Sequence, residues 1–316
     1  MKRVAIIYGG PSNEHEVSIS SAKNILKNID KNKWEVLEIF IDKKGKFFIK
    51  NNDSKDKVTF SENKLTSQLK ERDISKVFPI LHGKYGEDGK IQKILERAGI
   101  DFVGSSSVSS SLAIDKFKAN KVYERENILI PKSKILTKNN HKHNLNYPII
   151  VKPIDEGSSF GLFKIDNEKD FLKKIDRIFS KNKRMLAQEF VSGREFTCGV
   201  LDIKNKIKVL SPSEIVLTKT KTFDYEAKYT KGAVKEITPA KIDKMLTRQI
   251  QELSKKCHKI LGCKDISRTD MILSSDNKLY ILETNTLPGM TQTSFIPEQA
   301  KVANIDIRDL IDILLS

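Results

Sequence analysis

Residues 268–288, R-T-D-M-I-L-S-S-D-N-K-L-Y-I-L-E-T-N-T-L-P, constrain the fold of this chain more than any other part of its sequence. Two short apolar runs, 271–273 and 279–282, flank the polar segment S-S-D-N-K. Apolar runs on both sides of a short polar segment predict a β-hairpin. Apart from its charged ends, this hairpin is apolar on both faces.

One end of the predicted hairpin gathers oxygen ligands. Counting outward from a two-residue turn at 276–277 places Asp270 opposite Glu283, with Asn285 beside Glu283 because strand residues two apart share a face. Two carboxylates this close repel each other unless a cation lies between them, and hard oxygen ligands suit Mg²⁺, which usually also needs phosphate oxygens. Arg268 adds a fixed positive charge on the same side. The sequence therefore predicts a magnesium site near a nucleotide, although these residues alone are also compatible with a surface hairpin whose charged ends are solvated.

The net charge raises the question of nucleic-acid or anionic-membrane binding, since 57 Lys and Arg against 41 Asp and Glu give +16. The lysines are scattered along the chain, and Phe and Tyr do not interleave with them. We therefore expect a solvated lysine-rich surface and no nucleic-acid partner.

The cysteines, Cys198, Cys257 and Cys263, have neither metal nor disulfide spacing, which indicates a reducing cytoplasm. The apolar run 4–8 is too short for a signal peptide and no stretch is long enough to span a membrane, so we expect a cytoplasmic protein without a membrane partner.

A length of 316 residues predicts two or three domains. The N-terminal part alternates strands, glycine-rich loops and helices. After a buried strand comes Gly9-Gly10-Pro11 and then an amphipathic helix, for which Ser12 or Asn13 is a plausible N-cap. The alternation predicts an open α/β sheet with ligands at the carboxyl ends of its strands. The predicted strands are 4–8, 34–41, 47–49, 77–81 and 100–103, with a helix at 90–98 that Gly99 ends.

The middle of the chain contains a second glycine-rich loop. A helix carries Asp115-Lys116, and later a strand at 147–151 leads into Lys152-Pro153 and the segment D-E-G-S-S-F-G, followed by a strand at 162–165. Small residues let backbone N–H groups approach a phosphate, and a lysine supplies a point charge, so this segment predicts a phosphate-covering loop. The G-x-x-x-x-G-K-[ST] order of a Walker loop is absent.

Further elements are predicted around and after this loop. The long stretch 218–239 lacks apolar periodicity and carries three aromatic residues, so it predicts a lid or binding loop. A long amphipathic helix at 241–261 follows and leads the chain to the hairpin. The remaining predicted elements are a helix at 168–179, strands at 185–190, 195–201 and 207–210, and helices at 297–303 and 307–315.

Eight sequence blocks resemble, in order, those of the D-alanine–D-alanine ligases of the ATP-grasp superfamily. They are G-G-P-S-N-E-H-E-V-S, H-G-K-Y-G-E-D-G, D-K, V-K-P-I-D-E-G-S-S-F-G, G-R-E-F-T, D-Y-E-A-K-Y, R-T-D and E-T-N-T-L-P-G-M-T, and they run from Val4 to about Pro297. The resemblance implies an α/β protein (α+β in its ATP-grasp part) with three domains. These are an N-terminal open α/β sheet domain at 1–104, a central ATP-grasp domain at 105–187, and a C-terminal ATP-grasp domain at 188–316 with the lid loop and the hairpin.

The reaction implied by this resemblance is the joining of two D-alanines for peptidoglycan synthesis. ATP phosphorylates the first carboxylate to D-alanyl phosphate, which the second amine attacks, leaving ADP and phosphate. The implied cofactors are ATP and two Mg²⁺ ions, with Mn²⁺ as a substitute, and the implied assembly is a homodimer. An ATP-grasp ligase with another second substrate, such as D-serine or D-lactate, is the alternative. A basic nucleic-acid-binding protein, which the charge permits, leaves the hairpin and the lid loop unexplained.

The resemblance also implies the site residues, position by position. Asp270, Glu283 and Asn285 match the metal ligands. ATP would be bound by Lys116, Lys152, Ser159 and Lys228, with Gln188, Glu189, Phe190 and Val191 along the adenine and Glu195 at the ribose. The implied catalytic residues are Glu14, Ser158, Tyr229 and Arg268, with Glu14 binding the ammonium of the first D-alanine. The implied substrate residues are His82, Gly289, Ser294 and Phe295.

Taken singly, several of these residues have simpler explanations. Glu14 fits a first-turn helix carboxylate, His82 a turn histidine, and Lys116 a solvated charge. Two positions also depart from the family pattern: Gln188 stands where glutamate is frequent, and Phe295 where a smaller aliphatic residue is common. Relatives that use D-lactate generally lack a tyrosine at the position of Tyr229, so the resemblance favours an amine as the second substrate.

Overall fold

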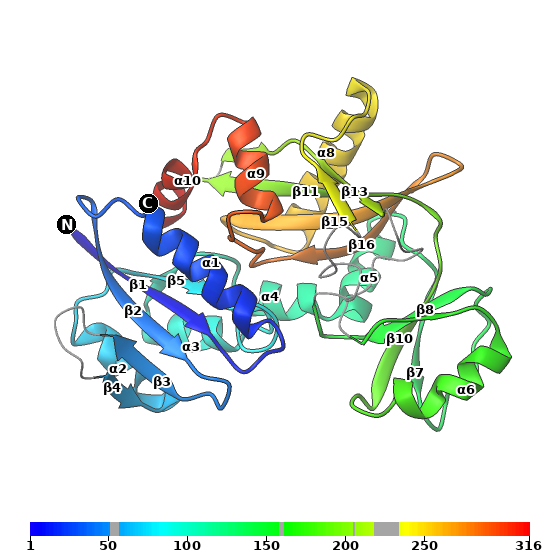
Figure 1. Cartoon of the computed structure of the whole chain (residues 1–316), viewed down its shortest axis with the longest axis horizontal. Coiled ribbons are helices and arrows are strands. Elements are labelled where there is room, and N and C mark those ends of the chain that lie inside the picture. Colours follow the sequence, from blue (N-terminus) through cyan, green and yellow to red (C-terminus); the bar gives the residue numbers. More distant parts are fainter. Residues whose placement is uncertain (51–56, 158–160, 205, 218–233) are drawn as a thin grey trace.

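The chain forms three β-sheets with helices packed on them, as shown in a computed structural model (Figure 1). The structure describes residues 1–50, 57–157, 161–204, 206–217 and 234–316. The sheets follow one another along the chain, with strand orders β4-β3-β2-β1-β5-β6, β7-β10-β8-β9 and β14-β13-β11-β15-β16, and β12 pairs with β11. This mixed α/β architecture confirms the predicted fold class.

The first sheet is the predicted open α/β sheet. Strands β2, β1, β5 and β6 run parallel, and β3 and β4 extend the sheet antiparallel. Residues of β1 alternate between the two faces, so that Ile6 packs toward α1 while Ile7 packs toward α2 and α3. Its elements are β1 (Lys2–Gly9), α1 (His15–Asn28), β2 (Trp34–Ile41), β3 (Phe47–Lys50), β4 (Lys57–Phe60), a 3₁₀ turn (Glu62–Lys64), α2 (Leu65–Lys70), β5 (Lys76–Ile80), α3 (Lys90–Ala98) and β6 (Asp101–Phe102).

Two local predictions for helix ends were wrong. The N-cap of α1 is Glu14, and its side chain makes no capping bond. The hydroxyl of Ser12, one turn short of the helix, accepts from the backbone nitrogen of Glu14 at 3.2 Å and donates to the carbonyl of His82 at 2.6 Å. The residues around Asp115 form two helices, α4 (Ser107–Ile114) and α5 (Lys116–Arg125), and not one. Asp115 is extended there (ψ 91°), and its carboxylate caps α5 by accepting from the backbone nitrogen of Lys118 at 3.0 Å.

The second sheet has one helix on its face. Phe171 and Ile178 of α6 pack on Leu136, Val151 and Met185 of the strands. The elements are β7 (Ser133–Thr137), β8 (Ile149–Pro153), β9 (Phe163–Ile165), α6 (Glu168–Ile178) and β10 (Arg184–Glu189). Strand β7 was not predicted, because its S-K-I-L-T sequence has only a weak apolar alternation.

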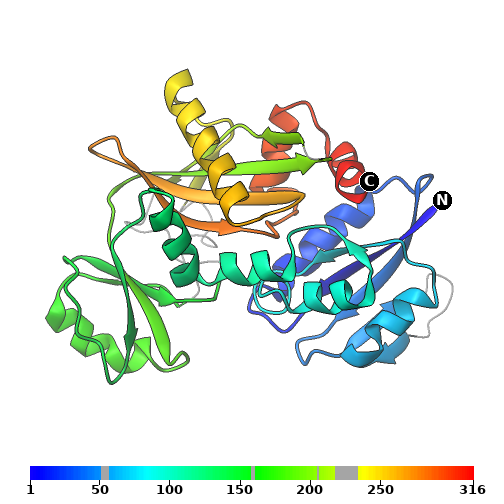
Figure 2. The same ribbon diagram turned by 180° about the vertical axis from the view of Figure 1, so that it is seen from behind.

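The third sheet lies between helices from distant parts of the chain. Helix α8 packs on it together with α4 and α5, and these helices lie on the side of the molecule that faces the viewer in Figure 2. Its elements are β11 (Gly193–Ile203), β12 (Lys206–Val209), β13 (Ser213–Leu217), β14 (Val234–Ile237), α8 (Lys244–Ile260), β15 (Ile266–Ser274), β16 (Leu279–Asn285), α9 (Phe295–Val302) and α10 (Ile307–Leu315). Strand β14 lies inside the stretch predicted as a lid loop, and residues 218–233 of that stretch lie outside the described residues.

The end of the chain returns to its beginning. Leu310 and Leu314 of α10 share a hydrophobic cluster with Ile25 of α1 and Trp34 of β2, and the indole nitrogen of Trp34 donates to Asp312 at 2.7 Å. The two termini consequently lie on the same side of the molecule (Figure 1). The three sheets agree in order with the three predicted domains, whose limits at 104/105 and 187/188 stay a prediction.

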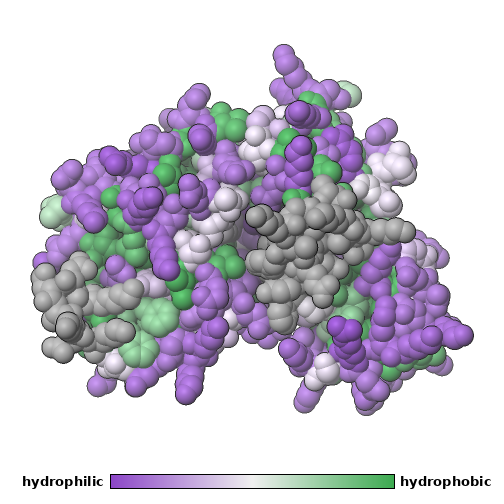
Figure 3. All heavy atoms as spheres, in the orientation of Figure 1, coloured by the Kyte–Doolittle hydropathy of each residue, from purple (hydrophilic) through white to green (hydrophobic). Residues whose placement is uncertain are grey.

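The surface is rich in hydrophilic side chains. Figure 3 shows hydrophilic residues over most of one face, with hydrophobic residues in separate small groups. Many lysines pair with nearby carboxylates, such as Lys121 with Glu124 at 2.6 Å and Lys174 with Asp170 at 2.8 Å. Such exposed pairs contribute little to stability, and a solvated surface accounts for them.

Candidate active site

The β15–β16 hairpin has the predicted pair at its open end but a different turn. Asp270 lies opposite Glu283, as expected. Nearer the turn, Leu273 pairs with Leu279 and not with Tyr280, because the loop has one more residue than predicted. A register shift at Asp270/Met271 leaves Leu282 as the extra residue on β16, and this bulge compensates for the longer turn.

The longer turn has a local cause. Asn277 adopts a left-handed conformation (φ 58°), which asparagine tolerates better than most residues. The backbone nitrogen of Ser274 donates to the carbonyl of Lys278 at 3.0 Å and closes a three-residue loop. Two deviations from the predicted register therefore cancel where the charged pair lies.

The open end of the hairpin faces a cavity of about 770 Å³ that is bounded by residues of the second and third sheets, by α1 and by the loops that follow β1 and β5. Every predicted site residue in the described part of the chain lines this cavity: Glu14, His82, Lys116, Lys152, Gln188, Glu189, Phe190, Val191, Glu195, Arg268, Asp270, Glu283, Asn285, Gly289, Ser294 and Phe295. The other four, Ser158, Ser159, Lys228 and Tyr229, lie outside the described residues. Strands β1 and β5 present their carboxyl ends to the cavity through Glu14 and His82, as expected for an open α/β sheet.

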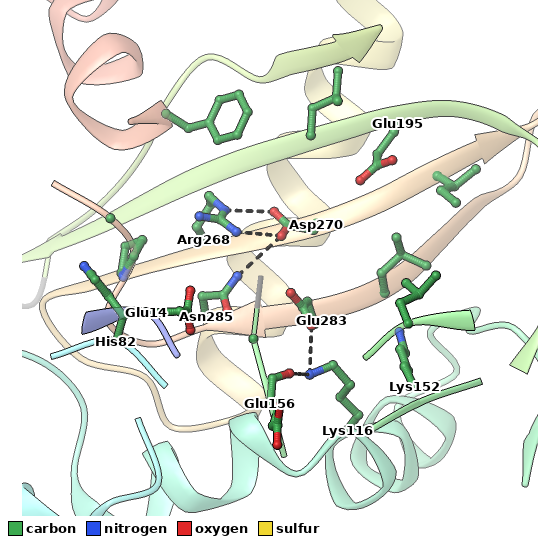
Figure 4. Close-up of a pocket in the computed structure, with 18 of the residues that line it drawn as sticks. Glu14, His82, Lys116, Lys152, Glu156, Glu195, Arg268, Asp270, Glu283 and Asn285 are labelled. Atoms are coloured by element: carbon green, nitrogen blue, oxygen red, sulfur yellow. Dashed lines mark hydrogen bonds and ion pairs between the residues drawn. The ribbon is translucent and has the colours of Figure 1, made fainter. Parts of the chain in front are cut away.

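Each carboxylate of the hairpin has its own cationic partner (Figure 4). Arg268 binds Asp270 through two hydrogen bonds, from Nε to Oδ1 at 2.9 Å and from Nη2 to Oδ2 at 2.7 Å. Lys116, the first residue of α5, lies 3.1 Å from Glu283 and donates to the carbonyl of Glu156 at 2.6 Å. In this structure the repulsion between the two carboxylates is therefore balanced by protein cations.

Burial and charge act in opposite directions on the pKa values of the site. Burial raises the pKa of Glu283, but Lys116 and Lys152 outweigh burial and lower it to about 2. Burial and the charge of Lys116 lower the pKa of Lys152 to about 8. The pKa of Glu195 is raised to about 8 by burial and by the charges of Asp270 and Glu283. The cavity therefore holds closely spaced opposite charges, an environment typical of functional sites.

The oxygen donors of the hairpin fit a magnesium ion whose coordination shell is completed by other ligands. Asp270 and Glu283 offer carboxylate oxygens, and Asn285 lies beside them, with its Nδ2 3.4 Å from Asp270. Among the described residues, no three His, Cys, Asp or Glu side chains come together to hold a metal. Two carboxylates and an amide leave coordination positions for water or phosphate oxygens, as Mg²⁺ commonly requires.

The opposite wall of the cavity comes from the N-terminal sheet. The glycine-rich loop passes close to the carboxylate of Glu14. A Cβ atom added at Gly157 would lie only 2.7 Å from Oε2 of Glu14. His82 is only 5% exposed. Its Nδ1 donates to the carbonyl of Leu287 at 3.0 Å, because a carbonyl can only accept, and in the neutral ring its Nε2 then accepts from Ser21 at 3.2 Å. These contacts give His82 a defined orientation against the loop after β16.

Glu87 is a cavity residue that the sequence reasoning missed. It is 8% exposed, and its Oε2 accepts from the backbone nitrogen of Gly83 at 2.7 Å. Burial and the nearby Glu14 raise its pKa to about 8. The signal was present in H-G-K-Y-G-E-D-G, but the loop pattern does not tell which of Glu87 and Asp88 turns inward.

Comparisons with known proteins agree with this geometry along the whole chain. Two family models match, "D-ala D-ala ligase N-terminus" over residues 3–105 and "D-ala D-ala ligase C-terminus" over residues 109–316. The chain belongs to the D-alanine–D-alanine ligase family. Among curated relatives of this family, the D-alanine–D-alanine ligase of Leptospira biflexa is 40% identical, with 99% of this chain and 97% of that protein covered. D-alanine–D-alanine ligase B of Clostridium tetani is 35% identical, with 99% and 92% covered.

Solved structures of ligases share this fold. The VanG D-Ala:D-Ser ligase of Enterococcus faecalis superposes with a TM-score of 0.89 at 33% identity, covering 99% of this chain and 98% of that one. The D-alanine–D-alanine ligase of Bacillus anthracis in complex with ATP superposes with a TM-score of 0.77 at 28% identity, covering 100% and 96%. These ligase structures confirm the predicted ATP-grasp architecture.

Proposed function

We propose that this protein is an ATP-dependent ligase that joins two D-alanines for peptidoglycan precursor synthesis. The observation that carries the proposal is one cavity in which Arg268, Asp270, Glu283 and Asn285 of the hairpin face Lys116. Acyl phosphate formation moves negative charge between phosphate and carboxylate oxygens, so it needs fixed cations and oxygen ligands in a partly enclosed site. The same set lies in a chain that belongs to this ligase family over nearly its whole length.

ATP would lie between the second sheet and the hairpin. Lys152 at the end of β8 and Lys116 would offer charge to its phosphates, and residues 188–191, at and just beyond the end of β10, would lie along the adenine. Glu195 on β11 would accept hydrogen bonds from the ribose hydroxyls. Ser159 and Lys228, which lie outside the described residues, are proposed to complete phosphate binding.

Asp270, Glu283 and Asn285 would hold Mg²⁺, and the donor chemistry described above supports this assignment. When bound, the metal supplies positive charge that orients the phosphates and stabilises the charge developing on them. The proposal includes two ions that share a carboxylate, with Mn²⁺ able to replace Mg²⁺.

The substrates would occupy the part of the cavity nearest the first sheet. Glu14 would bind the ammonium group of the first D-alanine, with Ser158 and Tyr229 completing a hydrogen-bonded link, and His82 lies beside it. The ring of Phe295 and the hydroxyl of Ser294 would bound the second D-alanine, with the hydroxyl facing its carboxylate. Arg268 and the backbone N–H of Gly289 would face the reacting oxygens.

The assembly and location are part of the same proposal. In the described part of the chain, no helix is long and apolar enough to cross a bilayer. We propose a cytoplasmic homodimer on the strength of the family resemblance. Light scattering of the purified protein is expected to give the mass of two chains, and the mass of one chain would contradict the proposal.

The test of the function is coupled ADP release with Mg²⁺-ATP. D-Alanine, L-alanine, and D-alanine with D-serine or D-lactate are compared, and the products are identified by mass. Turnover with D-alanine alone, giving its dipeptide, is expected. Turnover only with a mixed pair would instead indicate a ligase with another second substrate, and no turnover with any pair would overturn the proposal.

Chelation of divalent ions is expected to stop turnover. The hairpin carboxylates are paired with Arg268 and Lys116. Asp270, Glu283 and Asn285 would hold a divalent ion, which would supply further positive charge for the phosphates that these side chains do not provide. EDTA should abolish ADP release, and Mg²⁺ or Mn²⁺ should restore it. Calorimetry measures the affinity for ATP with and without Mg²⁺ and needs no turnover. Equal affinities under the two conditions would contradict the metal assignment.

Phe295 is expected to restrict the second substrate. Its ring lines the cavity, with the Arg268 guanidinium 5.8 Å from its centre. Phe295→Leu removes bulk from the pocket, so turnover with D-serine relative to D-alanine should rise, by about tenfold or more, as is usual for small changes in apolar pockets. Phe48→Leu is the control, because Phe48 also has a cation near its ring, Lys46 at 5.9 Å, but lies on β3 away from the cavity. An unchanged ratio of D-serine to D-alanine turnover in Phe295→Leu would contradict the placement of Phe295 in the pocket for the second substrate.

A further inference from the structure

The peptide groups around Gly289 are held by side chains of α1. Ser21 accepts a hydrogen bond at its Oγ from the backbone nitrogen of Met290 at 3.1 Å. Asn24, one turn further along α1, donates from Nδ2 to the carbonyl oxygen of Met290 at 2.9 Å. Residues three apart lie on the same face of a helix, so α1 presents one acceptor and one donor to a single residue of the loop. Helix α1 therefore holds both the backbone N–H and the backbone C=O of Met290.

A third contact fixes the same loop ahead of Gly289. His82 Nδ1 donates to the carbonyl of Leu287, and in the neutral ring its Nε2 accepts the hydroxyl proton of Ser21. Ser21 is fully buried. One of its hydrogen bonds is to Met290 in the loop, and the other is to His82, which itself binds the loop. The hydroxyl thus connects the two points at which residues 287–290 are held.

The orientation of Asn24 is itself controlled. Asn28, the next residue on this face of α1, donates to the side-chain oxygen of Asn24 at 3.1 Å. With its oxygen occupied by that donor, the amide of Asn24 presents its nitrogen to the carbonyl of Met290.

Ser294 bounds Gly289 from the other side. A Cβ atom on Gly289 would lie 2.9 Å from the hydroxyl of Ser294, so a side chain there would displace that hydroxyl. Thr291 in turn fixes Ser294, by a hydrogen bond from its backbone nitrogen to the Ser294 oxygen at 3.0 Å and a hydroxyl contact at 2.7 Å. Gly289 thus lies between a backbone held by α1 and a hydroxyl held by Thr291.

We propose that Ser21 and Asn24 are positioning residues, which hold the backbone of residues 287–290 so that the N–H of Gly289 meets the reacting oxygens. The inference rests on the proposed function, in which this N–H faces the transition state. A preorganised donor stabilises developing charge only if it does not move during the reaction. Two residues of α1 would in this way influence the reaction, although the proposed metal ligands lie on the third sheet.

Ser21→Ala and Asn24→Ala test the proposal, with Ser18→Ala as the matched control. Ser18 is a fully buried serine one turn earlier on the same helix, and it accepts from the backbone of Gly9 and donates to the carbonyl of Ile80, away from the loop. The two test variants should lower kcat by about tenfold to a hundredfold, as expected for small misplacements in active sites. The KM for ATP should not change, because the nucleotide residues belong to other elements. Ser18→Ala should lower the Tm comparably but change kcat less than about twofold, since only stability is affected.

Hydrogen exchange provides a second measurement that needs no turnover. The amide of Met290 should exchange faster in Ser21→Ala than in the wild type or in Ser18→Ala, because its acceptor is gone. Unchanged kcat in both test variants, an equal loss of kcat in Ser18→Ala, or unchanged exchange at Met290 would each overturn the inference. If the wild type makes no D-alanyl-D-alanine, the proposed function fails, and the exchange measurement still decides whether Ser21 holds this backbone.

Discussion

Glu283→Gln is expected to reduce turnover by about 10²–10³-fold, the usual cost of removing one preorganised electrostatic group from an active site. The substitution keeps the shape of the side chain and an oxygen that accepts from Lys116, but it removes one negative charge. Glu283 is the carboxylate on which the charges of Lys116 and Lys152 converge, and they lower its pKa to about 2. Its neutral replacement would leave these two lysines without their main counter-charge and the metal with one anionic ligand fewer.

Nucleotide binding should respond differently from turnover. Because the lysines lose a competing carboxylate, metal-free ATP should bind Glu283→Gln at least as tightly as it binds the wild type. Steady-state kinetics give the turnover, and calorimetry with ATP gives the affinity. Near-wild-type turnover would refute the assignment of Glu283 as a metal ligand.

Asp276→Asn is the control for a change of charge on the same hairpin. Asp276 lies at the tip, about half exposed, and pairs with Lys278 at 2.7 Å. It should leave turnover unchanged. The lowered pKa of Glu283 means that its ionised form stabilises the folded protein above the ordinary pKa of 4.5, and that this stabilisation is lost as the pH falls toward 2. At neutral pH, Glu283→Gln should therefore also lower the Tm, which thermal unfolding of both variants will measure.

Local patterns in the sequence were sufficient where a single element decides the structure. The strand Trp34–Ile41 and the helix Lys90–Ala98 have the predicted bounds, the helix because Gly99 takes the left-handed conformation that ends it. The strand Ser213–Leu217 was missed because its pairing with β11 and β14, and not its own pattern, makes it a strand. In the hairpin, the Asp270–Glu283 pair was right although the turn was not, since the bulge at Leu282 offsets the longer loop.

Contacts between distant segments were beyond the sequence. Blocks of sequence indicate which residues belong to the site, but the Ser21–Met290 hydrogen bond joins residues 269 positions apart. No periodicity or spacing predicts such a bond, because it depends on how α1 packs against the loop after β16. The same holds for Glu87, whose inward orientation follows from its bond to the backbone of Gly83.

Arg268→Lys is expected to lower turnover by about 10²–10³-fold although it conserves the charge. The guanidinium of Arg268 binds both oxygens of Asp270 and lies beside the ring of Phe295, with its centre 5.8 Å away. Burial lowers its pKa, but Asp270 and Glu283 outweigh burial and raise it, so the group stays charged. A lysine ammonium cannot bind both carboxylate oxygens in one plane and also present a second N–H to the reacting oxygens. Asp270 would then lose its fixed orientation, and the reacting oxygens would lose the N–H donor that the guanidinium directs at them.

Arg194→Lys provides a control, because Arg194 makes the same kinds of contact on the neighbouring strand β11, with a side chain that is more exposed (46% against 18% for Arg268). It binds both oxygens of Glu214, at 2.7 and 2.9 Å, and its guanidinium lies 5.1 Å from the ring of Phe196, but it does not line the cavity. Steady-state kinetics should show turnover within about twofold of the wild type for Arg194→Lys, as usual for substitutions away from a site. An equal loss in both variants would assign the effect to the stability of the third sheet, whereas wild-type turnover in Arg268→Lys would mean that charge alone, without the two-pronged contact to Asp270, is sufficient at this position.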